Sequence, residues 1–291
     1  AYPDDAAYNE ALLEHWHLTG DLDKEIHYLD PVADKLIDFA AEYEQVRRLL
    51  QRGLARLTEH DARRVQLLNH VVGTCWIQGN YAQAIELANE AYALAQQHDD
   101  LTGVSRSLNN LAIVAMLQGD YARAQDYFTR RLSIRQSIGD QRGIAGSLNN
   151  LGVVAYYQGH HVDAQDYYER SLNIYYAIGE QRGIADGVNN LGLLALNEGD
   201  YDQARDYLER GLSIYQAIGD QANFAMSLLN LGTVAQQQGH YTQVQDYCER
   251  SLSIWQAIGG QRGVAGNLNN LGLAALKRGD HAQARDHHER S

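Results

Sequence analysis

The chain has 291 residues, 21% of them charged, and a net charge of −13, which excludes a strongly basic protein of the kind that binds nucleic acid or anionic membranes. An acidic chain of this kind favours a neutral or basic partner, and no apolar run reaches the roughly 18 residues of a membrane span. Cys75 and Cys248 have no metal or redox spacing, so we expect no disulfide framework and a reducing, cytoplasmic location.

Residues 1–60 carry apolar side chains at helical spacing in three segments, at about residues 6–18, 22–40 and 43–57. Gly20 separates the first two segments, and Pro31 either kinks the second helix or begins a new one. We interpret residues 1–60 as a degenerate N-terminal repeat with one additional helix, which together cap a longer array.

From residue 61 onward a motif of the form Leu-x-x-Leu-Gly-x-x-Ala returns with a period of 40 residues. The glycine that ends each copy keeps this spacing throughout, at Gly79, Gly119, Gly159, Gly199, Gly239 and Gly279. A fixed period in this range is typical of a solenoid, in which each repeat contacts only its neighbours. We therefore predict that residues 61–291 are a regular array in an all-α, right-handed superhelical solenoid of antiparallel helical hairpins. The last repeat is shorter than the others, and we expect it to be truncated within a longer chain.

Each repeat is predicted to contain two helices, A and B, which in one copy occupy about residues 141–158 and 161–178. The glycine between them suits a left-handed C-cap, and the residue after it suits an N-cap. The predicted N-caps are Asn80, Asp120, Asp200 and Asp280, with His160 and His240 as weaker substitutes. Short turns of this kind make the angle between the two helices repeat along the chain.

On a helical wheel, one face of helix A carries Leu148, Leu151 and Gly152, which we expect to pack on helix B. Asn149 and Asn150 point the other way, toward the side that lines the concave surface of a stacked array. Two adjacent asparagines cost a helix on the order of 1 kcal/mol relative to alanine. Their amides could bind the backbone of another chain, or one amide of each pair could hold the register of the neighbouring repeat; both alternatives remain open.

The predicted groove residues are therefore the asparagines and tyrosines on that side of helix A. They are Asn69, Asn109, Asn110, Asn149, Asn150, Tyr156, Tyr157, Asn189, Asn190, Asn197, Asn230, Asn269 and Asn270. Arg142, Arg182 and Arg262 open their A helices and could form a groove rim that receives an acidic side chain or a C-terminal carboxylate. Alternatively, and in our view preferably, they pair with carboxylates in the nearby acidic turns.

Helix B carries Asp and Arg four residues apart in successive repeats, from Asp126 and Arg130 to Asp286 and Arg290. We interpret these pairs as a solvated outer face rather than as a docking stripe. The adjacent histidines His160–His161 and His287–His288 point about 100° apart on a helix, which disfavours a shared metal ion. No Ser/His/Asp or Cys/His arrangement stands out, so we expect no catalytic residue, no cofactor and no metal.

The pattern formed by Leu148, Leu151–Gly152, Ala155, Gly159, Ala164 and Tyr168 resembles the tetratricopeptide repeat. The period resembles the longer-helix variety found in kinesin light chains and bacterial signalling proteins. The resemblance implies no catalysis and the binding of extended peptides or partner proteins in the concave groove. It assigns a clamp on the ligand backbone to Asn69, Asn109, Asn149, Asn189 and Asn269. In one repeat Leu229 replaces the first asparagine of the pair and only Asn230 remains. This replacement interrupts the row of asparagines and predicts an apolar pocket in the C-terminal third.

Residues 14–21, together with Tyr28 and Leu29, look like the helical segment that follows the nucleotide-binding module in bacterial signal-transduction ATPases. In that class the repeats form a sensor, although this chain has no GxxxxGK[ST] phosphate loop. We therefore expect a non-catalytic protein- or peptide-binding module, acting as the sensor or scaffold part of a larger bacterial signalling protein. The alternative is a structural array that self-associates through its ends.

Overall fold

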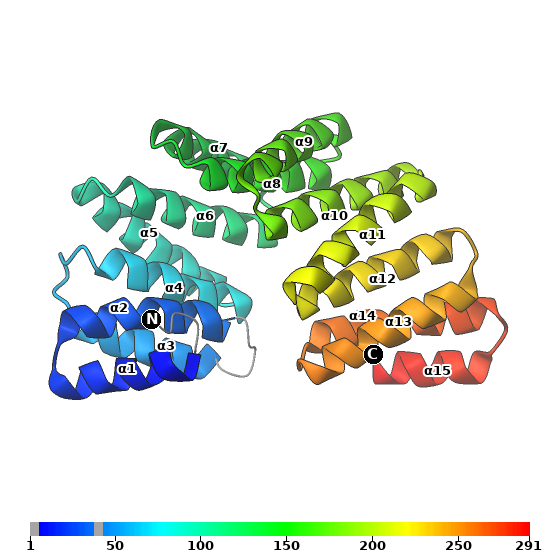
Figure 1. The fold of residues 1–291 in the computed structure, drawn as a ribbon, viewed down its shortest axis with the longest axis horizontal. Coiled ribbons are helices and arrows are strands. Elements are labelled where there is room, and N and C mark those ends of the chain that lie inside the picture. Colours follow the sequence, from blue (N-terminus) through cyan, green and yellow to red (C-terminus); the bar gives the residue numbers. More distant parts are fainter. Residues whose placement is uncertain (1–5, 38–42) are drawn as a thin grey trace. The chain divides into compact units, whose positions relative to one another are not determined.

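The computed structural model describes residues 6–37 and 43–291, and within these ranges the chain forms fifteen α-helices (Figure 1). They are α1 (Ala6–Thr19), α2 (Leu22–Ile37), α3 (Tyr43–Ala55), α4 (Arg64–Ile77), α5 (Tyr81–Gln97), α6 (Leu101–Leu117), α7 (Tyr121–Ser137), α8 (Gln141–Tyr157), α9 (His161–Ile178), α10 (Gln181–Glu198), α11 (Tyr201–Ile218), α12 (Gln221–Gln237), α13 (Tyr241–Ala257), α14 (Gln261–Lys277) and α15 (His281–Arg290). None of these described helices is both long and apolar enough for a membrane crossing. The all-α prediction is confirmed.

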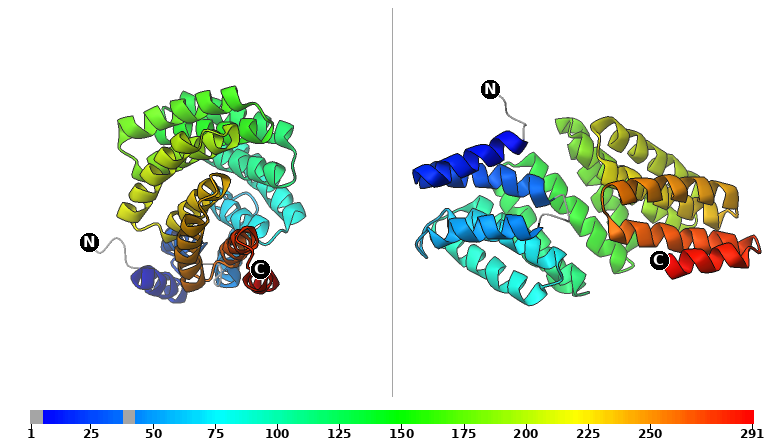
Figure 2. Two further views of the ribbon diagram at one scale, coloured as in Figure 1. Left: turned by 90° about the vertical axis from the view of Figure 1, so that its right-hand side faces the viewer. Right: turned by 90° about the horizontal axis from the view of Figure 1, so that it is seen from below.

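Within α1–α7 and within α8–α15, successive helices pack against one another as antiparallel hairpins, and the even-numbered helices from α2 to α14 are the A helices of these hairpins. A helices also contact the A helix of the next hairpin, as α4 does with α6 and α12 with α14. Figure 2 shows the last hairpin, in which α14 and α15 lie side by side. Contacts within each hairpin and with the next hairpin, in the described part of α1–α7 and of α8–α15, give the layering of a solenoid.

The chain divides into two compact units, the first ending at Gly139 and the second beginning at Asp140. The first unit holds α1–α7, with α1 as an additional helix before the α2–α3 hairpin. The second unit holds α8–α15. In α2 the helical backbone continues through Pro31, so no new helix begins there, and residues 38–40 of the predicted segment lie outside the described residues. The division into a cap at 1–60 and an array at 61–291 stays a prediction.

The turns between helices are built as the 40-residue pattern predicts. The glycines at the helix ends have positive φ, and Gly179, for example, has a φ of 70° that favours a residue without Cβ. The carboxylates that follow these glycines accept a hydrogen bond from the third residue of the next helix, at Asp120, Asp140, Glu180, Asp200, Asp220 and Asp280. Asp100 does the same after Asp99, which has a positive φ of 53° in place of a glycine. The predictions for Asn80, His160 and His240 are wrong, because none of these side chains makes a cap bond. The amide of Asn80 donates to Gln83 instead.

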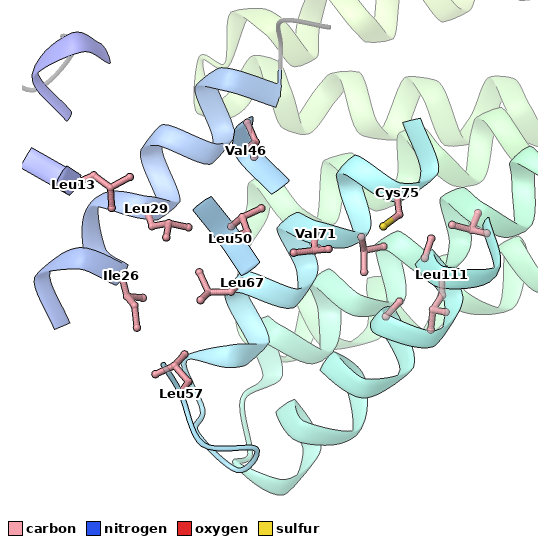
Figure 3. Packing of buried hydrophobic residues seen from close by; sticks show 14 residues of the cluster. Leu13, Ile26, Leu29, Val46, Leu50, Leu57, Leu67, Val71, Cys75 and Leu111 are labelled. Carbon is pink, nitrogen blue, oxygen red and sulfur yellow. The ribbon is translucent and has the colours of Figure 1, made fainter. Parts of the chain in front are cut away.

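A continuous core connects the first three helices to the array in the first unit (Figure 3). Leu13 of α1, Leu29 of α2 and Leu50 of α3 are buried in one cluster with Leu67 and Val71 of α4. The same cluster reaches α6 through Leu111 and Val114. Residues before the regular repeats therefore cover the apolar face of α4 and bury it from water.

A buried carboxylate, which the sequence analysis did not predict, connects α1, α2 and α3. Glu25 is fully buried and pairs with Arg56, with Arg52 at 3.4 Å and with His17 Nδ1 at 2.8 Å. Charged groups lose hydration when buried, so a carboxylate in this position needs several partners. These partners come from α1 (His17) and from the end of α3 and the residue just after it (Arg52 and Arg56).

In the hairpins of the second unit, a glycine on the A helix packs against a larger side chain on the B helix. A Cβ at Gly152 would lie 2.6 Å from the ring of Tyr168, which is 2% exposed. Cys248 occupies the same place opposite Gly232, and burial raises the pKa of its thiol to about 12. Cys75 is buried as well, and both cysteines are free thiols.

The Asp–Arg pairs of the B helices lie on an exposed surface. Four of the five form ion pairs of 3.0–3.5 Å, at Arg130, Arg170, Arg250 and Arg290. Arg210 instead donates to the hydroxyl of Tyr176 at 3.0 Å. Pairs exposed to this extent contribute only a few tenths of a kcal/mol, as expected of a solvated face.

Candidate functional site: the inner face of the A helices

We call the side of the A helices turned away from their B helices the inner face. In α8 the opposite side carries Leu148, Leu151 and Gly152, which are buried against the hairpin partner. Asn149 and Asn150, which are half-buried, lie on the inner face, and Tyr157 at the end of α8 is 58% exposed there. In this helix the wheel prediction therefore separates the side that packs on the B helix from the opposite side correctly.

In the first unit, the asparagines form hydrogen bonds between repeats. Asn69 is 8% exposed, and its Oδ1 accepts from the Nδ2 of Asn110 at 3.0 Å and from Ser107 Oγ at 3.2 Å. Its own Nδ2 donates to the carbonyl of Val65 at 2.8 Å. The amide oxygen of Asn69 thus accepts two hydrogen bonds from α6, and these bonds hold α4 and α6 in register.

The second unit repeats this arrangement with one change. Asn190 Nδ2 donates to Asn149 Oδ1 at 2.9 Å, which is the same bond 80 residues further along the chain. Asn189 Oδ1 accepts from Ser227 Oγ at 3.3 Å. Leu229 replaces the asparagine that would accept the next bond of this kind, and the Nδ2 of Asn270 donates instead to the hydroxyl of Thr233 at 3.4 Å. The register role that the sequence left open is therefore present in both units, and ligand binding by these amides stays a prediction.

The remaining predicted residues differ in exposure. Asn109, Asn150, Asn230 and Tyr156 are half-buried, whereas Asn197 and Asn269 are exposed. Tyr156 packs edge-on against Tyr157 and His161, and burial raises the pKa of its hydroxyl. Asn197 Nδ2 lies 3.2 Å from His161 Nε2.

The predicted rim arginines pair with acidic helix caps. Arg142 lies 3.6 Å from the carboxylate of Glu180, and Arg182 lies 3.3 Å from Asp220. Each of these carboxylates caps the A helix of the following repeat. The alternative that the sequence favoured, pairing within the acidic turns, is thus confirmed for both residues. The side chain of Arg262 lies outside the described residues.

Two apolar side chains, Met226 and Leu229, lie on α12 where the row of asparagines is interrupted. Met226 is 40% exposed on the inner face of α12, and Leu229, one turn later, is half-buried. The Cδ2 of Leu229 lies 3.4 Å from the position of a Cβ at Gly266, so it packs over the backbone of α14. The result is an apolar surface next to half-buried and exposed amides.

The first unit contains a pocket that sequence reasoning missed, which we call the basic pocket. It has a volume of about 240 Å³. It lies beside Asn69 and is lined by His70, Arg106, Asn109, Asn110, Arg131 and Arg135. The signal in the sequence was present, because its cationic residues depart from the residues at the same place in other repeats. Among the described residues, no group of three His, Cys, Asp or Glu side chains is arranged to hold a metal ion.

We expect the replacement of Asn149 by alanine to destabilise the second unit by about 1 kcal/mol. The change removes the acceptor of the Asn190 amide, and a half-buried donor without a partner costs about that amount. Urea denaturation followed by tryptophan fluorescence checks it, with exposed Asn269→Ala as the control that should change stability by much less. Equal effects of the two variants would contradict a register role for Asn149.

Asp186 on α10 accepts a hydrogen bond of 2.5 Å from the hydroxyl of Tyr215. Burial raises the pKa of its carboxyl above the ordinary 3.8, and Tyr215 and Arg182 offset part of the rise. The folded chain therefore holds this proton to a higher pH than the unfolded chain, so Asp186 costs stability as the pH rises from about 4 through its folded pKa.

We expect Asp186→Asn to be more stable than the unmodified chain at pH 7, with a smaller gain at pH 4. The asparagine keeps an acceptor for Tyr215 but carries no charge. Urea midpoints measured at both pH values check the result, and exposed Asp202→Asn is the matched control. A gain that is the same at both pH values would show that ionisation of Asp186 is not its cause.

Comparison with solved structures gives many similar folds. The Rap conjugation gene regulator of the plasmid pLS20, solved in complex with a Phr peptide, has a TM-score of 0.67 at 14% identity, over 98% of this chain and 72% of that one. BtubC (BKLC) from P. vanneervenii has a TM-score of 0.58 at 22% identity, covering 81% of this chain and 92% of that one.

A third similar structure is a Signal Transduction ATPase with Numerous Domains (STAND) protein with a tetratricopeptide repeat sensor, from Pyrococcus horikoshii. Its TM-score is 0.67 at 16% identity, and the match covers 98% of this chain but 46% of that one. At these identities the likeness concerns the fold. A search of curated proteins finds no match.

The sequence itself matches a family model described as the tetratricopeptide repeat. The matched segments are residues 63–137, 103–177, 183–247 and 223–291, which together span most of the chain. Helical hairpins with glycine-mediated packing and a fixed 40-residue period agree with this match. The chain therefore belongs to the tetratricopeptide repeat family.

Proposed function

We propose that the chain is a non-catalytic binding module that takes a protein or an extended peptide on the inner face of its A helices. The observation that carries the proposal is the difference in side-chain exposure between the two sides of a single A helix. In α8, Leu148 and Leu151 are 2–3% exposed, whereas Tyr157 on the inner face is 58% exposed. Rigid helices that present amides and an aromatic ring in this way offer both hydrogen bonds and contact area.

The similar structures support the same proposal. The Rap regulator was solved with a peptide, and the Pyrococcus protein is described as carrying a tetratricopeptide repeat sensor. By analogy, we propose that this chain acts as the sensor or scaffold part of a larger signalling protein. An inner face of half-buried amides and exposed side chains is compatible with an extended ligand, whose backbone amides require partners when they leave water.

Selection of short peptides from a random displayed library tests the proposal. The unmodified chain should enrich a family of related peptides, and Tyr157→Ala combined with Asn269→Ala should weaken the binding of a selected peptide about tenfold, since both residues are exposed on the inner face. Asp246→Ala, which breaks an exposed ion pair on the outer face, is the control and should bind as the unmodified chain does. Failure to enrich any peptide counts against the proposal.

The competing function is a structural array that self-associates. Sedimentation of the same variants separates the two. If the inner-face variant lowers the association state while peptide binding is unchanged, the inner face is an interface between copies of the chain. If binding falls and the association state is unchanged, the binding module is supported.

A further inference from the structure

We propose that a second pocket of the first unit, on the side of α6 opposite the inner face, binds a tyrosine side chain of a partner protein. This pocket, which we call the outer pocket, lies between α5, α6 and α7 and has a volume of about 470 Å³. The inference goes beyond the proposed function, because it concerns a different surface and does not depend on a ligand at the inner face.

The position of the outer pocket follows from its lining on α6. Leu108 lines the pocket and is buried, and it occupies in α6 the place that Leu148 has in α8, on the side that packs on the B helix. The other walls come from the two B helices α5 and α7. A group bound there contacts two successive hairpins and leaves the inner face open.

Four residues of the outer pocket differ from the residues at the same places in the four repeats that follow. They are Tyr92 in place of leucine, Ala95 in place of an arginine or an aromatic residue, Asp99 in place of glycine and Leu101 in place of glutamine. Leu101 is 46% exposed, so an apolar side chain replaces a polar one at the surface. Asp99 has a φ of 53°, a left-handed conformation that favours glycine. Neither change improves the packing of the array.

The second unit indicates what the outer pocket lacks. There the ring of Tyr175 packs on Gly183, where a Cβ would lie 2.4 Å from it. In the first unit Ala95 stands at the place of that tyrosine, and the corresponding glycine, Gly103, is covered by the smaller side chain of Val65. Less side-chain volume is therefore present beside α6 than in the hairpins of the second unit, and the outer pocket borders this position.

The walls of the outer pocket suit an aromatic ring. Ala95, Val104 and Leu108 are buried, and Leu101 and the half-buried Ile134 complete an apolar lining. Its volume is about three times the ~150 Å³ of an apolar cavity that holds benzene. Apolar walls with a few polar groups are typical of pockets that bind organic ligands.

The polar groups of the outer pocket suit the hydroxyl of a phenol. The hydroxyl of Tyr92 accepts from Arg130 Nη2 at 2.7 Å and from Gln96 Nε2 at 3.1 Å, so both its lone pairs are used and its own proton remains to donate. The hydroxyl of Ser133 donates to the carbonyl of Thr129, and its oxygen remains an acceptor. A phenol can accept from Tyr92 and donate to Ser133, whereas a phenyl ring can do neither.

The rim of the outer pocket indicates that the ring belongs to a protein segment. Asp99, Leu101 and Arg130 are exposed, so a bound group remains partly in water and can continue along the surface. Pockets of this kind take a single aromatic anchor in protein interfaces. The carboxylate of Asp99 and the net charge of −13 favour neutral or basic residues next to the bound tyrosine.

The test uses the unmodified chain with ¹³C-labelled methyl groups on isoleucine, leucine and valine, and N-acetyl-tyrosine amide as the probe. The variant Tyr92→Leu with Leu101→Gln introduces the residues of the following repeats, so it is expected to fold, and circular dichroism verifies it. Leu117→Gln is the matched control, because it changes another exposed leucine of α6 and Gln237 occupies the same place in α12.

The probe should cause saturable shift changes at the methyl groups of Val104, Leu108 and Ile134 in the unmodified chain and in the control. Binding to the double variant should be about tenfold weaker, since it loses an aromatic contact and part of the apolar wall. N-acetyl-phenylalanine amide should bind about fivefold more weakly than the probe, and N-acetyl-leucine amide about tenfold more weakly. The peptide acetyl-Lys-Tyr-Lys amide should bind at least about twofold more tightly than acetyl-Glu-Tyr-Glu amide.

Three results of these titrations overturn the inference: unchanged methyl shifts at the outer pocket, equal binding of the leucine and tyrosine amides, or equal binding of the probe to the double variant and the unmodified chain. Sedimentation adds a fourth. If the unmodified chain and the control form dimers while the double variant stays monomeric, the occupant is a second copy of the chain rather than a different partner.

The outcome at the outer pocket is separable from the outcome at the inner face. The inner-face variant Tyr157→Ala with Asn269→Ala should bind the probe at the outer pocket as the unmodified chain does, because these residues lie on other helices. Loss of probe binding in that variant would overturn the assignment of the probe to the outer pocket. Failure of the peptide library at the inner face leaves this test unaffected.

Discussion

Replacing Tyr168 by alanine is expected to destabilise the second unit by about 3–5 kcal/mol, the usual cost of removing a buried aromatic side chain. Tyr168 is 2% exposed and lies at the centre of the α8–α9 hairpin. Its ring covers Gly152 so closely that the backbone of α8 cannot collapse into the space without moving the whole helix. The cavity would therefore remain largely open and add to the loss of burial.

Chemical denaturation followed by the fluorescence of Trp255, the tryptophan of the second unit, measures this effect. Tyr168→Phe is the matched control, since Phe128 occupies the same place in α7 and is fully buried. The control should lose far less stability than the alanine variant. A loss below about 1 kcal/mol for Tyr168→Ala would mean that the hairpin does not depend on this contact.

Replacing Glu25 by alanine is expected to destabilise the first unit by about 3 kcal/mol. The change removes the buried carboxylate that joins Arg52, Arg56 and His17, and breaking a buried ion pair from one side costs about 3–5 kcal/mol. We expect the lower end of this range, because the two arginine side chains are 27% and 30% exposed and can recover part of their hydration.

The measurement uses a Trp255→Phe background, so that Trp16 and Trp76 report on the first unit alone. Asp126→Ala is the control, because it breaks an exposed pair with Arg130 in the same unit and should cost less than about 0.5 kcal/mol. In a solenoid each hairpin depends on its neighbours, so faster hydrogen exchange should appear first in α1–α3. Equal effects of Glu25→Ala and Asp126→Ala would show that the buried network is not stabilising.

Much of this fold follows from local rules that can be recognised in the sequence. A 40-residue period, a glycine at each helix end and an acidic residue after it specify hairpins, because left-handed C-caps and side-chain N-caps are properties of a few adjacent residues. Gly179 and Glu180 behave as these rules predict. Asn80 does not, because Gln83 is close enough to take its amide, and the pattern of caps does not reveal such a competitor.

The inner face was predicted from helix geometry, but the partners of its side chains were not. A helical wheel places Asn149 opposite Leu148, yet it says nothing about the helix of the next repeat. Only the packing of α8 on α10 brings Asn190 within 2.9 Å of Asn149 and gives the pair a register role. The same holds for Arg142 and Arg182, whose acidic partners lie in the following repeat.

The sequence by itself thus determined the helices, their ends, the hairpins and the family, since these depend on residues close together in the chain. The tertiary structure decided which polar side chains hold the repeats together and which line a pocket. Glu25 has no signature in its own helix, and the residues of the basic pocket come from three helices and lie as far apart in the chain as His70 and Arg135. Their roles arise because contacts between helices set the burial and the charge around each group, and these contacts include residues as distant in the chain as Arg56 is from Glu25 and Arg135 from Ser105.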